Sequence, residues 1–236
     1  MNQGAYRNPF VVAADAGPAE RSQFIRRTYM HLAGAILAFV ALEAVLLNSP
    51  IAPAMMKLMV GGNFSWLIVL GLFMGVSWLA QSWALSGASL ALQYAGLGLY
   101  IVAEAIIFIP LLYVAAFYSS PDVIPMAAMI SIGLFLGLTG VVVTTRIDFS
   151  FLRGFIVIGG FVALGIIVAS ILFGFNLGVI FAGAMVLFAA AAILYSTSNV
   201  FLHYRTDQYV AASLSLFASI ALLFWYILRI LLSLRR

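Results

Sequence analysis

Seven long apolar stretches dominate the chain, and they constrain its fold more than any other feature. They cover residues 28–47, 64–84, 90–116, 124–145, 151–173, 177–197 and 209–232. Each reaches the roughly 20 residues that an α-helix needs to cross about 30 Å of hydrocarbon. The stretches are continuously apolar and lack the alternation of polar and apolar residues found in membrane β-barrels. The sequence therefore predicts an all-α polytopic membrane protein with seven transmembrane helices.

The composition agrees with lipid as the solvent, because 65% of the residues are hydrophobic and only 8% are charged. So few charges cannot cover a water-exposed surface. The connections between the stretches are short, so we expect one domain, residues 26–236, preceded by a polar cytoplasmic tail at residues 1–25. This tail lacks the apolar segment of a cleavable signal peptide, and we expect the first helix to direct insertion.

Basic residues are distributed unequally between the two sides of the predicted bundle. Seven lie on the side of the amino terminus and four on the other: Arg7, Arg21, Arg26, Arg27, Arg146, Arg153 and Arg205 against Lys57, Arg229, Arg235 and Arg236. Cytoplasmic loops carry the excess of Lys and Arg, and the first helix usually dominates. The amino terminus is therefore predicted to face the cytoplasm, with the carboxyl terminus outside.

Several function classes are disfavoured by the residues that are missing. Cysteine is absent, which excludes disulfides, thiol nucleophiles and thiolate metal sites. His31 and His203 are isolated from other metal ligands in the sequence, so we expect no metal and no cofactor. No Gly-x-Ser-Gly motif or pair of intramembrane aspartates occurs, and no basic stripe is interleaved with aromatic residues. We expect neither an enzyme nor a nucleic-acid-binding protein.

Glycines recur four residues apart within two of the apolar stretches, at Gly71 and Gly75 and at Gly133 and Gly137. In lipid this spacing allows helix backbones to approach closely. We expect these pairs to pack helices within one bundle, with a dimer interface as the alternative.

Two carboxylates interrupt the apolar stretches. Glu104 lies about fifteen residues into the third stretch, where an ionised carboxylate costs about 2.5–3.5 kcal/mol on insertion scales. Such a group must be paired, hydrated or protonated. Two interpretations follow for Glu104, a structural hydrogen bond between helices and a role in handling ions or protons.

Glu43 occupies a similar position in the first stretch, and the first and third helices run in the same direction. The two carboxyls are therefore predicted to reach similar depth, where neighbouring groups would share a proton. The alternative, which we favour for Glu43, is that its side chain extends toward the outer interface near Asn48.

Three segments resemble a known family. They are residues 24–29, 144–151 and 193–231, and the most specific words are Arg-Ile-Asp-Phe-Ser at 146–150 and Ile-Leu-Tyr at 193–195. Over nearly its whole length the chain resembles the Bax inhibitor-1 or transmembrane Bax inhibitor motif family, especially its bacterial YccA-like branch.

The resemblance implies a last helix wrapped by the other six and a place in the bacterial inner membrane. It also implies links to calcium leak, stress protection and modulation of a membrane-bound AAA protease. The family's two signature aspartates would fall on Ser196 and Ser219, so both acids are absent. Serine hydroxyls do not titrate near neutral pH, but they can bridge two helices by a hydrogen bond.

Charged residues in two predicted cytoplasmic loops are the remaining candidates. They are Arg146 and Asp148 in one loop and Arg205 and Asp207 in the other. We expect the loops to meet through an ion pair between Asp148 and Arg205 that closes the inner mouth; the alternative is a solvated interface. Two functions stay in view, a leak channel for calcium or protons and a non-conducting regulator that binds an AAA protease.

Overall fold

A computed structural model describes residues 11–87 and 89–235, and these ranges contain eight α-helices. The helices are α1 (Pro18–Leu47), α2 (Ile51–Val60), α3 (Asn63–Leu85), α4 (Leu90–Phe117), α5 (Val123–Thr145), α6 (Leu152–Phe173), α7 (Gly178–Leu202) and α8 (Tyr209–Leu234). All except α2 are long and apolar enough to cross a membrane. The predicted all-α architecture with seven spans is confirmed.

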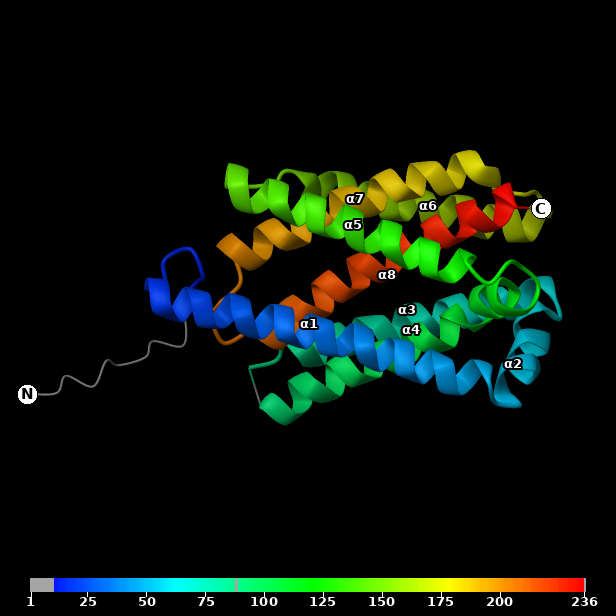
Figure 1. Cartoon of the computed structure of the whole chain (residues 1–236), viewed down its shortest axis with the longest axis horizontal. Helices are drawn as coiled ribbons and strands as arrows, with labels where there is room; N and C mark the ends of the chain where they lie inside the picture. Colours follow the sequence, from blue (N-terminus) through cyan, green and yellow to red (C-terminus); the bar gives the residue numbers. More distant parts are fainter. Residues whose placement is uncertain (1–10, 88, 236) are drawn as a thin grey trace, which may run out of the picture.

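The seven long helices alternate in direction, so the connections gather at two opposite ends of the bundle (Figure 1). One end holds the start of α1 and the α3–α4, α5–α6 and α7–α8 connections, and we call it the amino-terminal end. The carboxyl-terminal end holds α2, the α4–α5 and α6–α7 connections and the end of α8. The short helix α2 packs there against α3 and α4.

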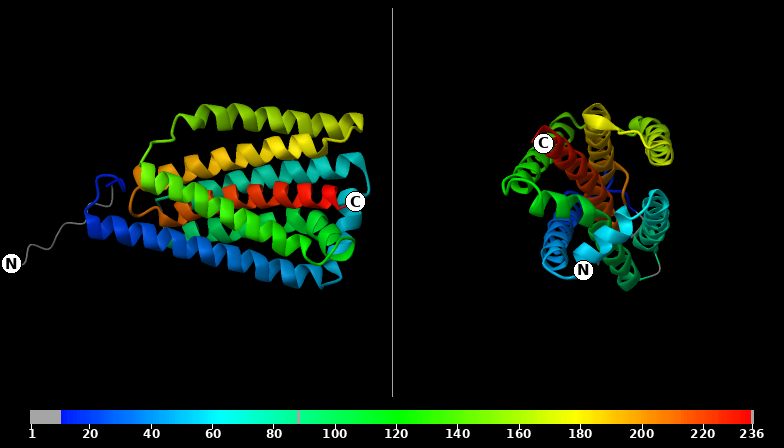
Figure 2. Two further views of the ribbon diagram at one scale, coloured as in Figure 1. Left: turned by 45° about the horizontal axis from the view of Figure 1, so that its top comes forward. Right: turned by 90° about the vertical axis from the view of Figure 1, so that its right-hand side faces the viewer.

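The last helix occupies the centre of the bundle (Figure 2). α8 packs against α1, α3, α4, α5 and α7, and more than half of its apolar window is buried. α6 lies at the periphery and has one buried residue, Ala163. The last helix is therefore central. The helices packed around it are α1, α3, α4, α5 and α7, whereas α6 packs on the outside against α7 and α3.

α1 begins at Pro18, well before the predicted start at residue 28, because proline in the first turn suits a helix amino terminus. The preceding segment docks on the α7–α8 connection: the Ala13 N–H donates to the Tyr204 carbonyl at 2.8 Å, and Val12 forms a β-bridge with Arg205. The predicted tail boundary at residue 25 therefore falls inside a helix. Residues 1–10 of that tail lie outside the described ranges.

One glycine lets α3 and α4 approach closely, and it is not among the four predicted. A Cβ at Gly96 would lie 2.5 Å from the Ala80 carbonyl oxygen of α3. A Cβ at Gly71, Gly75, Gly133 or Gly137 would meet nothing within 4 Å. The prediction that these two pairs pack helices within the bundle is therefore wrong, because those glycines face outward.

Candidate functional site

Three serine hydroxyls form a network between α7 and α8, with Ser196 and Ser219 buried and Ser215 half-buried. The Ser196 and Ser219 Oγ atoms are 3.1 Å apart, and the Ser215 hydroxyl donates to Ser196 Oγ at 3.2 Å. Ser219 donates to the Ser215 carbonyl at 3.0 Å, so the Ser196 hydroxyl is left to donate to Ser219. Every hydroxyl hydrogen then has an acceptor, which satisfies the rule that buried polar groups are paired.

The local sequence explains this arrangement. Ser215 and Ser219 are four residues apart on α8 and therefore lie on one face, toward α7. The family resemblance singles out Ser196 and Ser219, and the structure brings them together as an interhelical bridge. The resemblance does not include Ser215. Its spacing of four residues from Ser219 would have placed it on the same face of α8.

A second hydroxyl on α7 connects the bundle to the α5–α6 connection. Ser198 Oγ accepts the Phe149 N–H at 3.0 Å and donates to Asp148 Oδ1 at 3.4 Å. Ser198 is fully buried, two residues beyond Ser196. The Arg-Ile-Asp-Phe-Ser loop is thus held directly against α7.

Asp148 contacts His203, at 3.1 Å between Oδ2 and Nε2, in a hydrogen bond that is also an ion pair when the imidazole is protonated. Its other oxygen accepts the Ser150 N–H at 2.9 Å. The hydrogen bond from the Ser150 backbone N–H is the largest influence and holds the pKa of the Asp148 carboxyl below its usual range; burial opposes it, and the hydrogen bond with His203 adds a smaller lowering effect. Both side chains are about half exposed, so the pair lies at the surface of the amino-terminal end.

The predicted pair between Asp148 and Arg205 is wrong. Arg205 binds Asp207 in its own loop through two hydrogen bonds, Nε to Oδ1 at 3.0 Å and Nη2 to Oδ2 at 2.9 Å. A planar guanidinium fits a carboxylate in this two-point geometry, which leaves Asp148 to the imidazole at the end of α7. Arg146 ends α5 in the left-handed conformation, with φ 56°, and forms no ion pair in the described part of the chain.

A cavity of about 410 Å³ opens at the amino-terminal end of the bundle beside His203, and we call its opening the mouth. Its lining comes from α3, the α5–α6 connection, α6, α7 and the α7–α8 connection: Leu85, Ser150, Arg153, Tyr195, Asn199, His203, Tyr204 and Gln208. Tyr204 also interacts through its hydroxyl with Ser215. One side chain therefore borders both the cavity and the hydroxyl network.

The two intramembrane carboxyls are both buried, with Glu104 6% and Glu43 4% exposed. Glu104 has a polar partner one turn earlier on α4, the Tyr100 side chain. Both Glu43 oxygens are buried without a hydrogen-bond partner among the described residues. The favoured expectation that Glu43 extends toward the outer interface is therefore wrong.

Glu43 and Glu104 also lie at different depths, contrary to prediction. The rings of Phe39 on α1 and Phe108 on α4 are in contact, with centroids 5.2 Å apart. Glu43 follows Phe39 by one turn, whereas Glu104 precedes Phe108 by one turn. Because the helices run in the same direction, the carboxyls are about two turns, or roughly 11 Å, apart along the bundle. The predicted depths assume that the first helix begins near residue 28. Because α1 begins at Pro18, Glu43 lies further from the start of its helix than Glu104 does.

No group of three or more metal-binding side chains that could hold an ion occurs within residues 11–87 and 89–235. The fold and site define an integral membrane protein with seven membrane spans, whose polar centre lies between its last two helices. The model of the family described as inhibitor of apoptosis-promoting Bax1 matches residues 21–236. The chain belongs to this Bax inhibitor family.

Two uncharacterized bacterial proteins are similar to the chain. One, from Pasteurella multocida, is 30% identical over 200 residues, which cover 83% of each chain. The other, from Pseudomonas aeruginosa, is 41% identical over 110 residues, 46% of this chain and 49% of that protein. The match thus spans about half the length of the Pseudomonas relative. No solved structure matches.

Proposed function

We propose that the protein is a leak pathway for small cations in the bacterial inner membrane, with protons favoured over calcium. The observation that carries the proposal is the serine network at the bundle centre, bordered through Tyr204 by the cavity at the amino-terminal end. Hydroxyls both donate and accept hydrogen bonds, so a proton can be passed along such a chain. Calcium needs several oxygens with negative charge, and serines in place of an acidic pair supply none.

Glu104 is the titratable group that we assign to this pathway. The ring of Tyr100, its polar partner, lies 6.1 Å from that of Phe217 on α8. Phe217 stands between Ser215 and Ser219 in the sequence, so Glu104 is close in depth to the serine network. A carboxyl within a membrane span is by default a candidate for an ion or proton pathway, and Glu104, unlike Glu43, is close in depth to the serine network.

Flux measurements in proteoliposomes test the proposal, with proton and calcium entry followed separately between about pH 5 and 8. We expect proton flux above that of protein-free liposomes and little calcium flux. Glu104→Gln should flatten the pH profile of the flux, because glutamine keeps the shape of the protonated acid but cannot titrate. Glu43→Gln, a buried carboxyl outside the pathway, is the matched control. An unchanged pH profile in Glu104→Gln would contradict the assignment.

A second function, that of a non-conducting regulator that binds a membrane-bound AAA protease, is favoured by the docked tail. The Ala13 N–H donates to the Tyr204 carbonyl at 2.8 Å and the Thr206 N–H donates to the Val11 carbonyl at 3.2 Å, so the segment before α1 is bound to the α7–α8 connection. A partner that captured the tail would also act on the mouth. Copurification of the protease with the full chain, lost on deletion of residues 1–16, together with no flux of either ion, would support regulation over conduction.

A further inference from the structure

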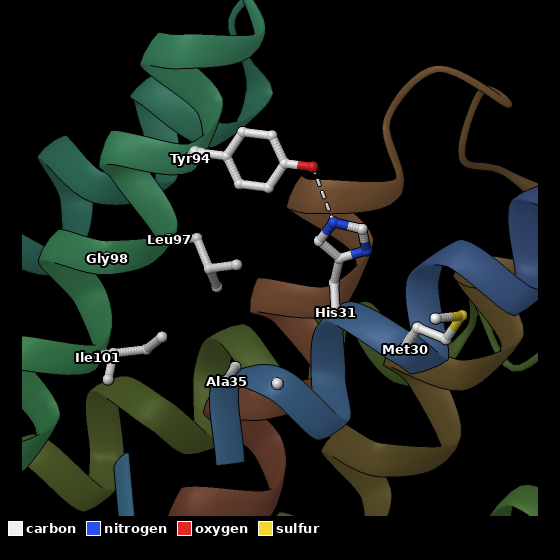
Figure 3. A pocket seen from close by; sticks show the side chains of 8 residues that line it. Met30, His31, Ala35, Tyr94, Leu97, Gly98 and Ile101 are labelled. Atoms are coloured by element: carbon white, nitrogen blue, oxygen red, sulfur yellow. Dashed lines mark hydrogen bonds between the residues drawn. The ribbon is translucent and has the colours of Figure 1, made fainter. Parts of the chain in front are cut away.

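A groove between α1 and α4 lies apart from the serine network, near the amino-terminal end of the bundle, and Figure 3 shows the residues that line it. Its volume is about 380 Å³. Four residues of each helix line it: Met30, His31, Gly34 and Ala35 on α1, and Tyr94, Leu97, Gly98 and Ile101 on α4. No lining residue is acidic. The groove has a polar rim and an apolar floor, and the two parts require separate descriptions.

His31 organises the polar rim. Its Nδ1 lies 2.7 Å from the Arg27 carbonyl, which can only accept, so Nδ1 carries the proton. In the neutral imidazole, Nε2 then accepts the Tyr94 hydroxyl at 2.8 Å, the bond drawn in Figure 3. This contact ties α1 to α4 at the mouth of the groove.

Arginines one turn beyond the lining residues of the groove make its rim positive. The Arg27 guanidinium lies over the ring of Tyr209, 5.5 Å from its centroid, and the His31 ring lies 5.0 Å from the same tyrosine. A cation–π contact of this kind holds the charge close to the rim. Arg26 is exposed beside it on the same turn of α1.

The floor of the groove is made by small residues. A Cβ added at Gly34 or at Gly98 would meet nothing within 4 Å, so both positions leave open space. Leu97 and Ile101 are buried beneath it and present an apolar surface. A slot of this kind suits a hydrocarbon chain that lies along the two helices.

The depth of the rim matches that of a lipid headgroup. Tyr94 is in the second turn of α4, which begins at Leu90, and Tyr209 is the first residue of α8. Both rings contact His31, so His31 is level with the ends of two membrane spans. Arg26 and Arg27 lie one turn further out on α1. Basic and aromatic side chains at this level bind anionic lipid headgroups.

We propose that this groove binds one anionic phospholipid, with its phosphate at Arg27 and the His31–Tyr94 pair and one acyl chain along Gly34 and Gly98. The positive rim, the open slot and the depth are independent observations that favour the same occupant. The lipid site does not depend on whether the protein conducts ions.

Native mass spectrometry of the full-length protein tests the proposal. The protein is released from mixed micelles that contain equal amounts of phosphatidylglycerol and phosphatidylcholine with matched acyl chains. We expect the wild type to retain one phosphatidylglycerol in preference to phosphatidylcholine. Arg27→Gln should weaken this retention about fivefold, the effect of one cation near an anionic surface. Lys57→Gln, which removes an exposed charge at the carboxyl-terminal end, should have no effect.

A second pair of variants tests the slot and guards against a failure to fold. Gly34→Leu and Gly98→Leu each place a side chain in open space, so the bundle should stay intact while lipid retention falls. Gly71→Leu on α3, equally open but outside the groove, is the matched control. Equal retention of both lipids by the wild type would overturn the proposal. So would undiminished retention in both glycine variants, or a dimer that fills the groove in place of lipid.

Discussion

Ser196 and Ser219 differ from a carboxyl pair in that a serine hydroxyl keeps its proton at every physiological pH. Their 3.1 Å contact therefore bridges α7 and α8 without responding to acid. Family resemblance was enough to predict which two positions meet. It could not predict that Ser215 completes the network, because that depends on how α8 is rotated toward α7.

Replacing both serines by aspartate should install the missing acid response. At this separation two carboxylates repel one another and titrate as one coupled pair. We expect Ser196→Asp with Ser219→Asp to lose roughly 2 kcal/mol of stability between pH 5 and 8, where the pair loses its shared proton. Thermal unfolding in detergent measures this loss. Ser196→Asn with Ser219→Asn should show no dependence of stability on pH in this range, because asparagine does not titrate. An equal dependence in that variant would mean that the aspartate pair is not its cause.

The contact between Asp148 and His203 makes a second prediction at this scale. The two side chains are about half exposed, so their coupling in a double-mutant cycle of Asp148→Asn and His203→Gln should not exceed about 1 kcal/mol. A parallel cycle of Asp148→Asn and Arg205→Gln should give no coupling, since Arg205 is held by Asp207. Unfolding free energies of the variants give both values. Coupling of Asp148 to Arg205, with none to His203, would mean that Arg205 is the partner of Asp148.

Among the elements, the α3–α4 pair depends on one glycine. Gly96→Ala should destabilise the bundle by about 1–3 kcal/mol, because its Cβ would overlap the Ala80 carbonyl oxygen and the backbone cannot yield as a side chain can. Gly71→Ala on the facing helix serves as the control, since its Cβ points into open space. Thermal unfolding in a fixed detergent compares the two. Equal melting temperatures for both variants would mean that α3 and α4 are further apart.

The end of α8 is clamped to the α4–α5 connection. Arg235 Nη1 donates to Asp122 Oδ1 at 2.6 Å and lowers the pKa of the Asp122 carboxyl to about 2. A depressed pKa contributes stability that is complete above the ordinary value near 4 and is lost as the pH falls toward 2. Hydrogen exchange of the last turn of α8 should therefore be constant from pH 8 to about 4, after correction for intrinsic rates, and faster below. In Asp122→Asn it should be fast throughout; protection equal to wild type would exclude the clamp.

For the whole molecule, seven spans place the two termini at opposite ends, and most of the basic residues lie at the amino-terminal end. We expect this end to face the cytoplasm, because positively charged segments are retained there. A reporter active only outside the cytoplasm should work when fused after Leu234, and a cytoplasm-only reporter should not. The same reporters fused ahead of Pro18 should give the opposite result, and a cytoplasmic signal at both sites would rule out seven crossings.

The sequence by itself determined the number and order of the membrane spans, because the length of an apolar run decides whether a helix can cross lipid. Only the tertiary structure decided which residues meet. Helices that are apolar on all sides carry no polar stripe to mark the inner face, so the burial of Glu43 and the outward orientation of Gly71 could not be predicted. The pairing of Asp148 with His203 likewise depended on the tertiary structure. α7 extends to Leu202 and places His203 beside Asp148, whereas Arg205 is bound by Asp207.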